Sequence, residues 1–304
     1  MSHLRSPLPC SSSTTHIQVQ ACLPNEFGDP SVRTHLFLSL QVDGLRGLGL
    51  WDKLAGKELM ESTTLRLSPA QVDHYNAQGY LIYDQPVLPE PTFKRLLDIF
   101  EEDLEQYGYD GLDVIHFRDS RLLDIVLSKE ILDLVEPVVG PNIGLWSTHF
   151  IAKEPKVGKA TPWHEDSSYW NGRVSTMAGI CTIWLALDRA TKDNGCMAII
   201  PGTHDNGFSS YLPVDESKNI FNSEIDPSMI DESKAVYMEL ELNRCSLHEG
   251  RIIHGAKPNT SDFRRAGYTI RFFPTTSKVY PEKNPGHKIW LARGVDVAGN
   301  VYEG

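Results

Sequence analysis

The stretch Trp163-His164-Glu165-Asp166 carries the most informative chemistry in this chain of 304 residues. In an extended segment, residues i and i+2 point to the same side, so His164 and Asp166 converge while Glu165 faces away. One imidazole beside one carboxylate supplies two of the three ligands of a 2-His-1-carboxylate triad. Such a triad occupies one face of an Fe(II) ion and leaves the other positions open. The third ligand has to come from another strand.

His254 is the best candidate for this third ligand. The apolar residues in Arg251-Ile-Ile-His254-Gly-Ala predict a buried strand that ends at the glycine after the histidine. His254 lies 90 residues after His164, which leaves room for several strands to bring the two together in a jelly roll. His248 lies six residues earlier with the same face parity and remains an alternative, in a segment that reads as a strand end or turn.

The order of the expected elements indicates the fold class. Helices are expected at 69–78, 92–107 and 129–138, with a short strand at 80–83. Further strands are expected at 144–153, 180–187, 197–200, 236–242, 251–254 and 267–273, separated by loops rich in Gly, Pro, Asn and Asp. Helices followed by many antiparallel strands predict a mainly β protein, with helices packed outside a β-sandwich or jelly roll.

Composition narrows the class of partner. Lys and Arg number 29 against 40 Asp and Glu, a formal net charge of −11 that disfavours nucleic acid as a partner. No run approaches the length of a membrane span. Five widely spaced cysteines fit a reducing compartment, so we expect a cytoplasmic protein. Nothing in the sequence specifies an oligomeric state.

The chain divides into two parts of different character. Residues 1–60 begin with a Ser/Thr/Pro-rich segment and lack a core-forming pattern, so we expect a largely flexible N-terminal extension. Its acid-poor start leaves organelle targeting open. Residues 61–304 carry the candidate ligands and are expected to form one jelly-roll domain.

Four blocks of this sequence, in order, resemble the phytanoyl-CoA dioxygenase family of Fe(II)/2-oxoglutarate-dependent oxygenases. The blocks are Pro-Trp-His164-Glu-Asp166-Ser-Ser-Tyr-Trp, Thr-Ile-Trp184-Leu-Ala-Leu-Asp, Asp193-Asn-Gly195-Cys-Met with Ile-Pro201-Gly-Thr-His204, and His254-Gly-Ala-Lys-Pro-Asn259 with Phe-Arg264-Arg265-Ala. The resemblance extends over residues 67–276, about two thirds of the chain.

The resemblance implies a double-stranded β-helix (jelly-roll or cupin-like) core and a dioxygenase that uses Fe(II), 2-oxoglutarate and O2. His164, Asp166 and His254 would hold the iron and form the catalytic centre. The enzyme would hydroxylate or otherwise oxidise an unactivated C–H bond of a small organic substrate, releasing succinate and CO2. Trp184 and His149 fall on positions that commonly line the cosubstrate site, whereas Ala256 stands where relatives often have a hydroxyl.

The far carboxylate of 2-oxoglutarate needs a cation, and arginine suits it because its planar fork binds carboxylates in a bidentate manner. Arg264, Arg265 and Arg271 are the candidates, and the neighbours 264 and 265 must face opposite sides of a strand. Hydropathy alone favours Arg264. In the family, the arginine commonly follows the distal histidine by eleven residues, which favours Arg265.

Two other classes of function remain as alternatives, a metal-dependent hydrolase and a non-catalytic jelly-roll binding module on the same scaffold. The substrate also stays open among acyl-CoA thioesters, amino acids, phosphonates and natural products. The net charge disfavours a polyanionic CoA ester unless Lys153, Lys156 and Lys159 form a basic patch.

Overall fold

A computed structural model describes residues 67–304, so the expected N-terminal extension lies outside the described residues. The helices are α2 (Pro69–Gln78), α3 (Glu90–Tyr107), α4 (Leu123–Val126), α5 (Lys129–Val139) and α6 (Asp166–Trp170). Helix α2 begins at a capping box in which Ser68 and Gln71 bond each other's backbone, and it ends at Gly79 in the left-handed region. Within residues 67–304, no helix is long and apolar enough to cross a membrane.

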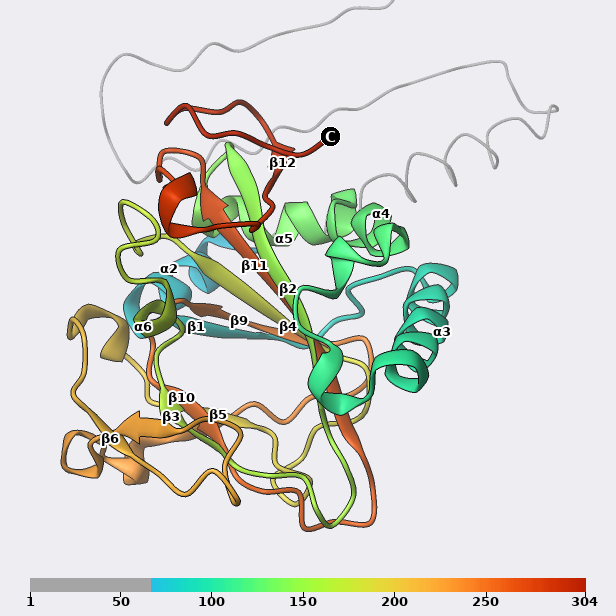
Figure 1. The fold of residues 1–304 in the computed structure, drawn as a ribbon, viewed down its shortest axis with the longest axis vertical. Coiled ribbons are helices and arrows are strands. Elements are labelled where there is room, and N and C mark those ends of the chain that lie inside the picture. The colour runs from blue at the N-terminus through green and yellow to red at the C-terminus, as the bar shows by residue number, and fades with distance from the viewer. Residues whose placement is uncertain (1–66) are drawn as a thin grey trace, which may run out of the picture. The chain divides into compact units, whose positions relative to one another are not determined.

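Two antiparallel sheets form the double-stranded β-helix that the sequence predicts (Figure 1). The strands are β1 (Tyr80–Tyr83), β2 (Ile143–Lys153), β3 (Thr161–His164), β4 (Cys181–Ala186), β5 (Met197–Ile199), β6 (Tyr211–Pro213), β7 (Ser223–Ile225), β8 (Val236–Tyr237), β9 (Cys245–Glu249), β10 (His254–Ala256), β11 (Arg265–Pro274) and β12 (Trp290–Arg293). The large sheet has the order β1-β9-β4-β11-β2-β12, and the small sheet has the order β3-β10-β5-β8. Strands β6 and β7 pair separately.

Strand β11 shows how the core and the cavity divide the large sheet. Ala266, Tyr268, Ile270 and Phe272 belong to the main apolar cluster, together with buried residues of α3, α4 and α5. The alternate residues Arg265, Thr269 and Arg271 line a cavity on the opposite face. Helices α3, α4 and α5 therefore cover the apolar face of the large sheet, and the polar face is left for a site.

The prediction of a strand at 251–254 is wrong, because residues 251–253 form a turn and His254 begins β10. The carboxylate of Glu249 stabilises this turn by accepting hydrogen bonds from the backbone nitrogen and the Nε of Arg251, at 2.6 and 2.8 Å. The strand expected at 236–242 is also shorter, since β8 ends at Tyr237. Strand β9 lies where the sequence indicated only a strand end or turn.

Candidate metal centre

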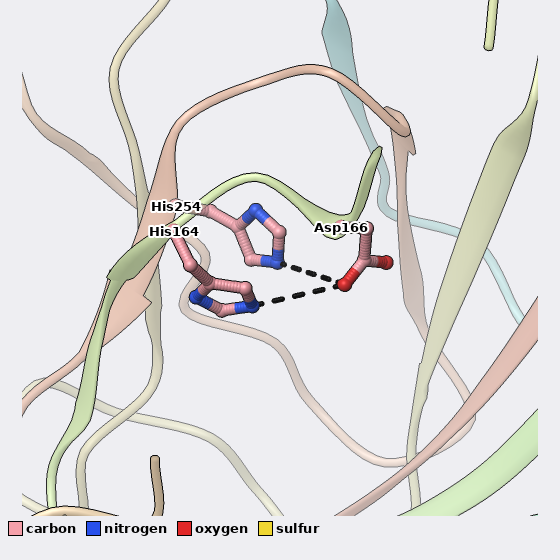
Figure 2. A group of neighbouring side chains, drawn as sticks. All are labelled: His164, Asp166 and His254. Carbon is pink, nitrogen blue, oxygen red and sulfur yellow. Dashed lines mark ion pairs between the residues drawn. The ribbon is translucent and has the colours of Figure 1, made fainter. Parts of the chain in front are cut away.

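Three side chains, called the triad below, converge between the sheets: His164, Asp166 and His254 (Figure 2). His164 ends β3 and His254 begins β10, and the pairing of these strands sets the two residues opposite each other. Glu165 has extended backbone, which turns Asp166 back to the side of His164. The Nε2 atoms of His164 and His254 lie 3.7 and 3.8 Å from Oδ1 of Asp166, a spacing that could hold one metal ion.

Backbone carbonyls fix both imidazole rings of the triad. Nδ1 of His164 donates to the carbonyl of Pro162 at 2.8 Å, and Nδ1 of His254 donates to the carbonyl of Ile252 at 3.0 Å. A carbonyl only accepts, so the proton of the neutral ring sits on Nδ1 and leaves the Nε2 lone pair for a metal. Two such nitrogens and one carboxylate are a donor set that fits Fe(II).

The carboxylate of Asp166 is held in its ionised form. Its Oδ2 accepts hydrogen bonds from Nε of Arg271 at 3.1 Å and from Oγ1 of Thr182 at 3.4 Å. Burial raises the pKa of Asp166, but Arg271 and the two histidines outweigh burial and hold the pKa well below its ordinary value. Oδ1 therefore faces the histidines as the free, charged oxygen.

Burial also favours the neutral form of the nearby histidines. It lowers the pKa of His254 well below the usual range, and the neighbouring His164 and His248 lower it further. Burial lowers the pKa of His248 to about 4. At neutral pH a metal therefore does not compete with a proton for His254.

Glu165 faces away from the triad, as the alternation of an extended segment requires. Its carboxylate is buried and accepts hydrogen bonds from Oγ of Ser209 at 2.5 Å and from the hydroxyl of Tyr211 at 3.4 Å. These bonds tie the segment between β3 and α6 to strand β6, so Glu165 positions the backbone of the triad without contacting the metal position.

A cavity of about 300 Å³ opens beside the triad. Of the residues expected at the cosubstrate site, His149, Trp184 and Arg265 line this cavity, and Arg264 does not. His149 lies in the middle of β2, where burial lowers the pKa of its ring to about 4. The structure thus brings most of the residues expected at the cosubstrate site onto one wall.

Arg265 is a buried cation without a carboxylate partner among residues 67–304. Its side chain is 2% exposed, its Nε donates to the carbonyl of Gly195 at 3.1 Å, and its guanidinium lies 5.3 Å from the ring centre of Trp184. Burial lowers the pKa of Arg265 to about 10, so the side chain stays charged at neutral pH. An anionic ligand would offset the cost of burying this charge.

Arg264 lies on the opposite face of the chain from the cavity. Its guanidinium pairs with Glu101 at 2.6 Å and with Asp188 at 2.7 Å, and it lies over the ring of Phe100. The charge of Arg264 is thereby satisfied on the side that carries helix α3.

Lys153, Lys156 and Lys159 do not form the basic patch that a CoA ester would require. Lys153 is buried, and its Nζ donates to the carbonyls of Lys159 and Lys257 at 2.6 and 2.8 Å. Lys156 pairs with Asp262 at 2.8 Å, and Lys159 donates to the carbonyl of Glu216. The three ammonium groups therefore do not present a common surface to a polyanion.

Several residues of the site were not identified from the sequence. Thr182 of β4 and Arg271 of β11 both contact Asp166, and the ring centre of Phe221 lies 4.9 Å from that of His164. Only cross-strand register and a loop bring these residues to the triad, and no local motif marks them.

Fold and site together define a double-stranded β-helix protein whose two histidines and one aspartate form a facial triad that could bind a metal ion. The chain belongs to the phytanoyl-CoA dioxygenase (PhyH) family, whose sequence profile matches residues 67–267. It is 27% identical over 175 residues to the phytanoyl-CoA dioxygenase domain-containing protein 1 homolog of Caenorhabditis elegans, covering 56% of this chain and 60% of that protein. It is 33% identical over 159 residues to the peroxisomal phytanoyl-CoA dioxygenase of Homo sapiens, covering 49% of this chain and 45% of that protein. The match thus spans 60% or less of these relatives.

Solved structures show the same fold. A non-heme alpha ketoglutarate dependent carbocyclase, SnoK, aligns with a TM-score of 0.61 at 23% identity, covering 74% of this chain and 91% of that one. CytC3 with Fe(II) and alpha-ketoglutarate aligns with a TM-score of 0.57 at 21% identity, covering 78% and 93%.

Proposed function

We propose that the protein is a non-haem Fe(II)- and 2-oxoglutarate-dependent dioxygenase that hydroxylates or otherwise oxidises an unactivated C–H bond of a small organic molecule, releasing succinate and CO2. One observation carries this proposal. The triad offers two nitrogens and one carboxylate oxygen within 4.8 Å of one another, in a cavity that also contains the unpaired cation of Arg265. Membership of the PhyH family supports the same reaction.

Each residue of the site has a proposed role in binding the iron or the cosubstrate. His164, Asp166 and His254 would hold Fe(II) on one face, and Arg265 would bind the far carboxylate of 2-oxoglutarate. Trp184, which lies against Arg265, would cover the cosubstrate, and His149 would line the same wall. When bound, iron would activate O2 with the two electrons that the oxidative decarboxylation of 2-oxoglutarate provides, and O2 would thereby supply the oxidising power for C–H cleavage. The protein would orient the substrate and exclude water.

An outer cavity of about 620 Å³ adjoins the inner one and is the proposed entrance for the substrate. Tyr109, Tyr169 and Phe221 supply aromatic surface there, and the charged lining residues are Asp110, Glu154, Glu216 and Lys159. An aromatic entrance with more acidic than basic groups favours a small neutral or cationic substrate over a CoA thioester. We also propose a cytoplasmic location and no nucleic-acid partner, on the charge and cysteine content of the sequence.

The two alternative functions make less use of these residues. A metal-dependent hydrolase has no need of a buried, unpaired arginine in the cavity beside its metal. A non-catalytic binding module has no need of three metal ligands whose rings and carboxylate are held in register by hydrogen bonds. The dioxygenase uses both features.

Anaerobic addition of Fe(II) and 2-oxoglutarate tests the proposal. We expect a weak visible charge-transfer band, which His254→Ala should abolish together with 2-oxoglutarate turnover. A screen for succinate release over amines, amino acids, phosphonates, acyl-CoA esters and natural products then identifies the substrate. Absence of the band in the wild-type protein, or full activity in His254→Ala, would overturn the assignment.

A further inference from the structure

His248 is a buried histidine of β9 that the proposed function leaves without a role. Its side chain is 1% exposed and lines the inner cavity. Neither of its ring nitrogens has a hydrogen-bond partner among residues 67–304. Buried polar groups are nearly always hydrogen-bonded, and an unmade bond costs folding free energy. A ligand in the cavity would supply the missing partner.

The register of the large sheet places His248 in a polar row beside the triad. His248 pairs with Thr182 of β4, and Thr182 pairs with Arg271 of β11. Thr182 and Arg271 both donate to Oδ2 of Asp166. His248 is the third member of this row, and it has no acceptor of its own within the described part of the chain.

The contacts between rings show on which side of the triad His248 lies. The ring of His164 is 4.9 Å from Phe221 and 6.1 Å from Tyr169, which line the outer cavity. The ring of His254 is 4.1 Å from His164 and 4.8 Å from His248. A substrate that enters past Phe221 and Tyr169 meets His164 first, and His248 lies beyond His254. A ligand that reaches His248 from the outer cavity therefore lies beside the triad.

His248 does not fit the role of a fourth metal ligand. A metal-binding histidine usually donates its other nitrogen to a carbonyl or carboxylate, as His164 and His254 do. Among the residues that the structure describes, His248 has no such bond, and it does not belong to the group of side chains whose ligand atoms converge. Its ring instead offers one N–H donor to an acceptor in the cavity.

We propose that His248 donates a hydrogen bond to the metal-chelating keto-acid end of 2-oxoglutarate, the opposite end from the carboxylate that Arg265 binds. The inference rests on the proposed function. The keto-acid end would chelate the metal, so it is the part of the cosubstrate that would come close to His254 and its neighbour His248. A neutral imidazole donating to an anionic oxygen forms a charge-assisted bond that orients this end.

The test compares His248→Phe with Ser246→Ala. Ser246 lies two residues earlier on the same strand and the same face, it is buried, and its Oγ also lacks a partner, but it does not line the cavity. Both changes remove buried unpaired polar atoms, so neither should lower the melting temperature of the metal-free protein. The probes are 2-oxoglutarate and pyruvate, which carries the keto-acid end alone, titrated anaerobically against the Fe(II) protein.

We expect His248→Phe to raise the Kd of 2-oxoglutarate and of pyruvate by the same factor, about tenfold, and to shift the visible band. Ser246→Ala should change neither, and Arg265→Met should weaken 2-oxoglutarate far more than pyruvate. His248→Gln, which keeps an N–H donor, should recover part of the affinity and provides the measurement if the Phe variant does not fold.

Two results would overturn the proposal while leaving the proposed function intact. Wild-type Kd values for both probes in His248→Phe would show that the ring contacts no cosubstrate. Loss of Fe(II) binding in the absence of any keto acid would make His248 a metal ligand instead. Absence of a 2-oxoglutarate complex in the wild-type protein would overturn the proposed function itself, and this inference with it.

Discussion

Arg271 donates from its Nε to Oδ2 of Asp166 over 3.1 Å, and the side chains of both residues are largely buried. This contact decides which carboxylate oxygen is available, because Oδ2 is engaged and Oδ1 faces His164 and His254. The same guanidinium donates through Nη1 to Thr269, so its own orientation is fixed by strand β11. Arg271 is thus a positioning residue for the candidate metal ligand.

Replacing Arg271 by methionine should weaken metal binding. The buried carboxylate of Asp166 then loses the cation that opposes the effect of burial, so its pKa rises and a larger share is protonated. Outer partners of metal ligands typically contribute about 10- to 100-fold in affinity, and we expect a loss of that order in a Co(II) titration at pH 7. Arg271→Lys should lose less. Equal affinities in Arg271→Met and the wild-type protein would contradict this role.

Replacing Arg265 by methionine should weaken the binding of 2-oxoglutarate strongly. Leaving a buried charge unpaired costs about 2–5 kcal/mol, which corresponds to a rise in Kd of roughly 30- to several thousand-fold. Arg264→Met is the matched control, because it removes a neighbouring guanidinium whose ion pairs lie outside the cavity. It should leave the Kd unchanged and cost about 1 kcal/mol of stability or less. A larger change of Kd in Arg264→Met would reverse the assignment.

The alternation of side chains along strands explains what the sequence could predict. The convergence of His164 and Asp166 follows from a spacing of two in extended backbone, and so do the opposite faces of Arg264 and Arg265. Hydropathy alone favoured Arg264 as the arginine inside the barrel, because it assumes that the apolar face of a strand lines the interior. The structure has Arg265 in the cavity instead. In β11 the apolar face packs instead under the helices, and the ring centres of Tyr268 and Phe150 lie 4.2 Å apart.

Other parts of the site depend on pairing between distant strands. Thr182, His248 and Arg271 come from three strands, and only the register of the large sheet aligns them in one row. The start of β10 at His254 depends on the turn that Glu249 stabilises, an interaction that apolar patterning does not encode. Local sequence therefore identified the triad, but it indicated other roles for His248 and Arg271 and gave no sign of Thr182.

Replacing Gly267 by alanine should disturb the cosubstrate wall. A Cβ at this position would overlap the indole ring of Trp184, the ring that lies against Arg265. Overpacking of this kind costs about 1–3 kcal/mol, so the melting temperature should fall by several degrees and 2-oxoglutarate should bind more weakly. The double variant with Trp184→Phe, which has a smaller ring, should recover part of the stability. A Gly267→Ala protein with wild-type stability and Kd would show that the indole can move freely.

His116 should make the stability of the metal-free protein depend on pH. The ring is buried against Phe117 and Trp290, and its Nδ1 lies 2.8 Å from Oγ1 of Thr148. Burial lowers the pKa of His116 to about 3, whereas a histidine in the unfolded chain has a pKa of about 6.5. Between these two values the unfolded chain binds a proton that the folded protein does not bind. Stability should therefore fall as the pH falls from about 6.5 toward 3.

Urea unfolding of the metal-free protein at pH 7.5, 6.5, 5.5 and 4.5 measures this dependence, with His116→Phe as the comparison. One histidine contributes a slope of at most about 1.4 kcal/mol per pH unit below its unfolded pKa, and the variant should lose that share. The slope should not vanish, because burial also lowers the pKa values of His149 and His287 to about 4. Above pH 7.5 the free energies of unfolding of the two proteins should differ by a constant amount, because His116 then binds no proton in either the folded or the unfolded protein. Identical slopes below pH 6.5 would mean that His116 is protonated inside the folded protein, against the environment that Phe117 and Trp290 provide.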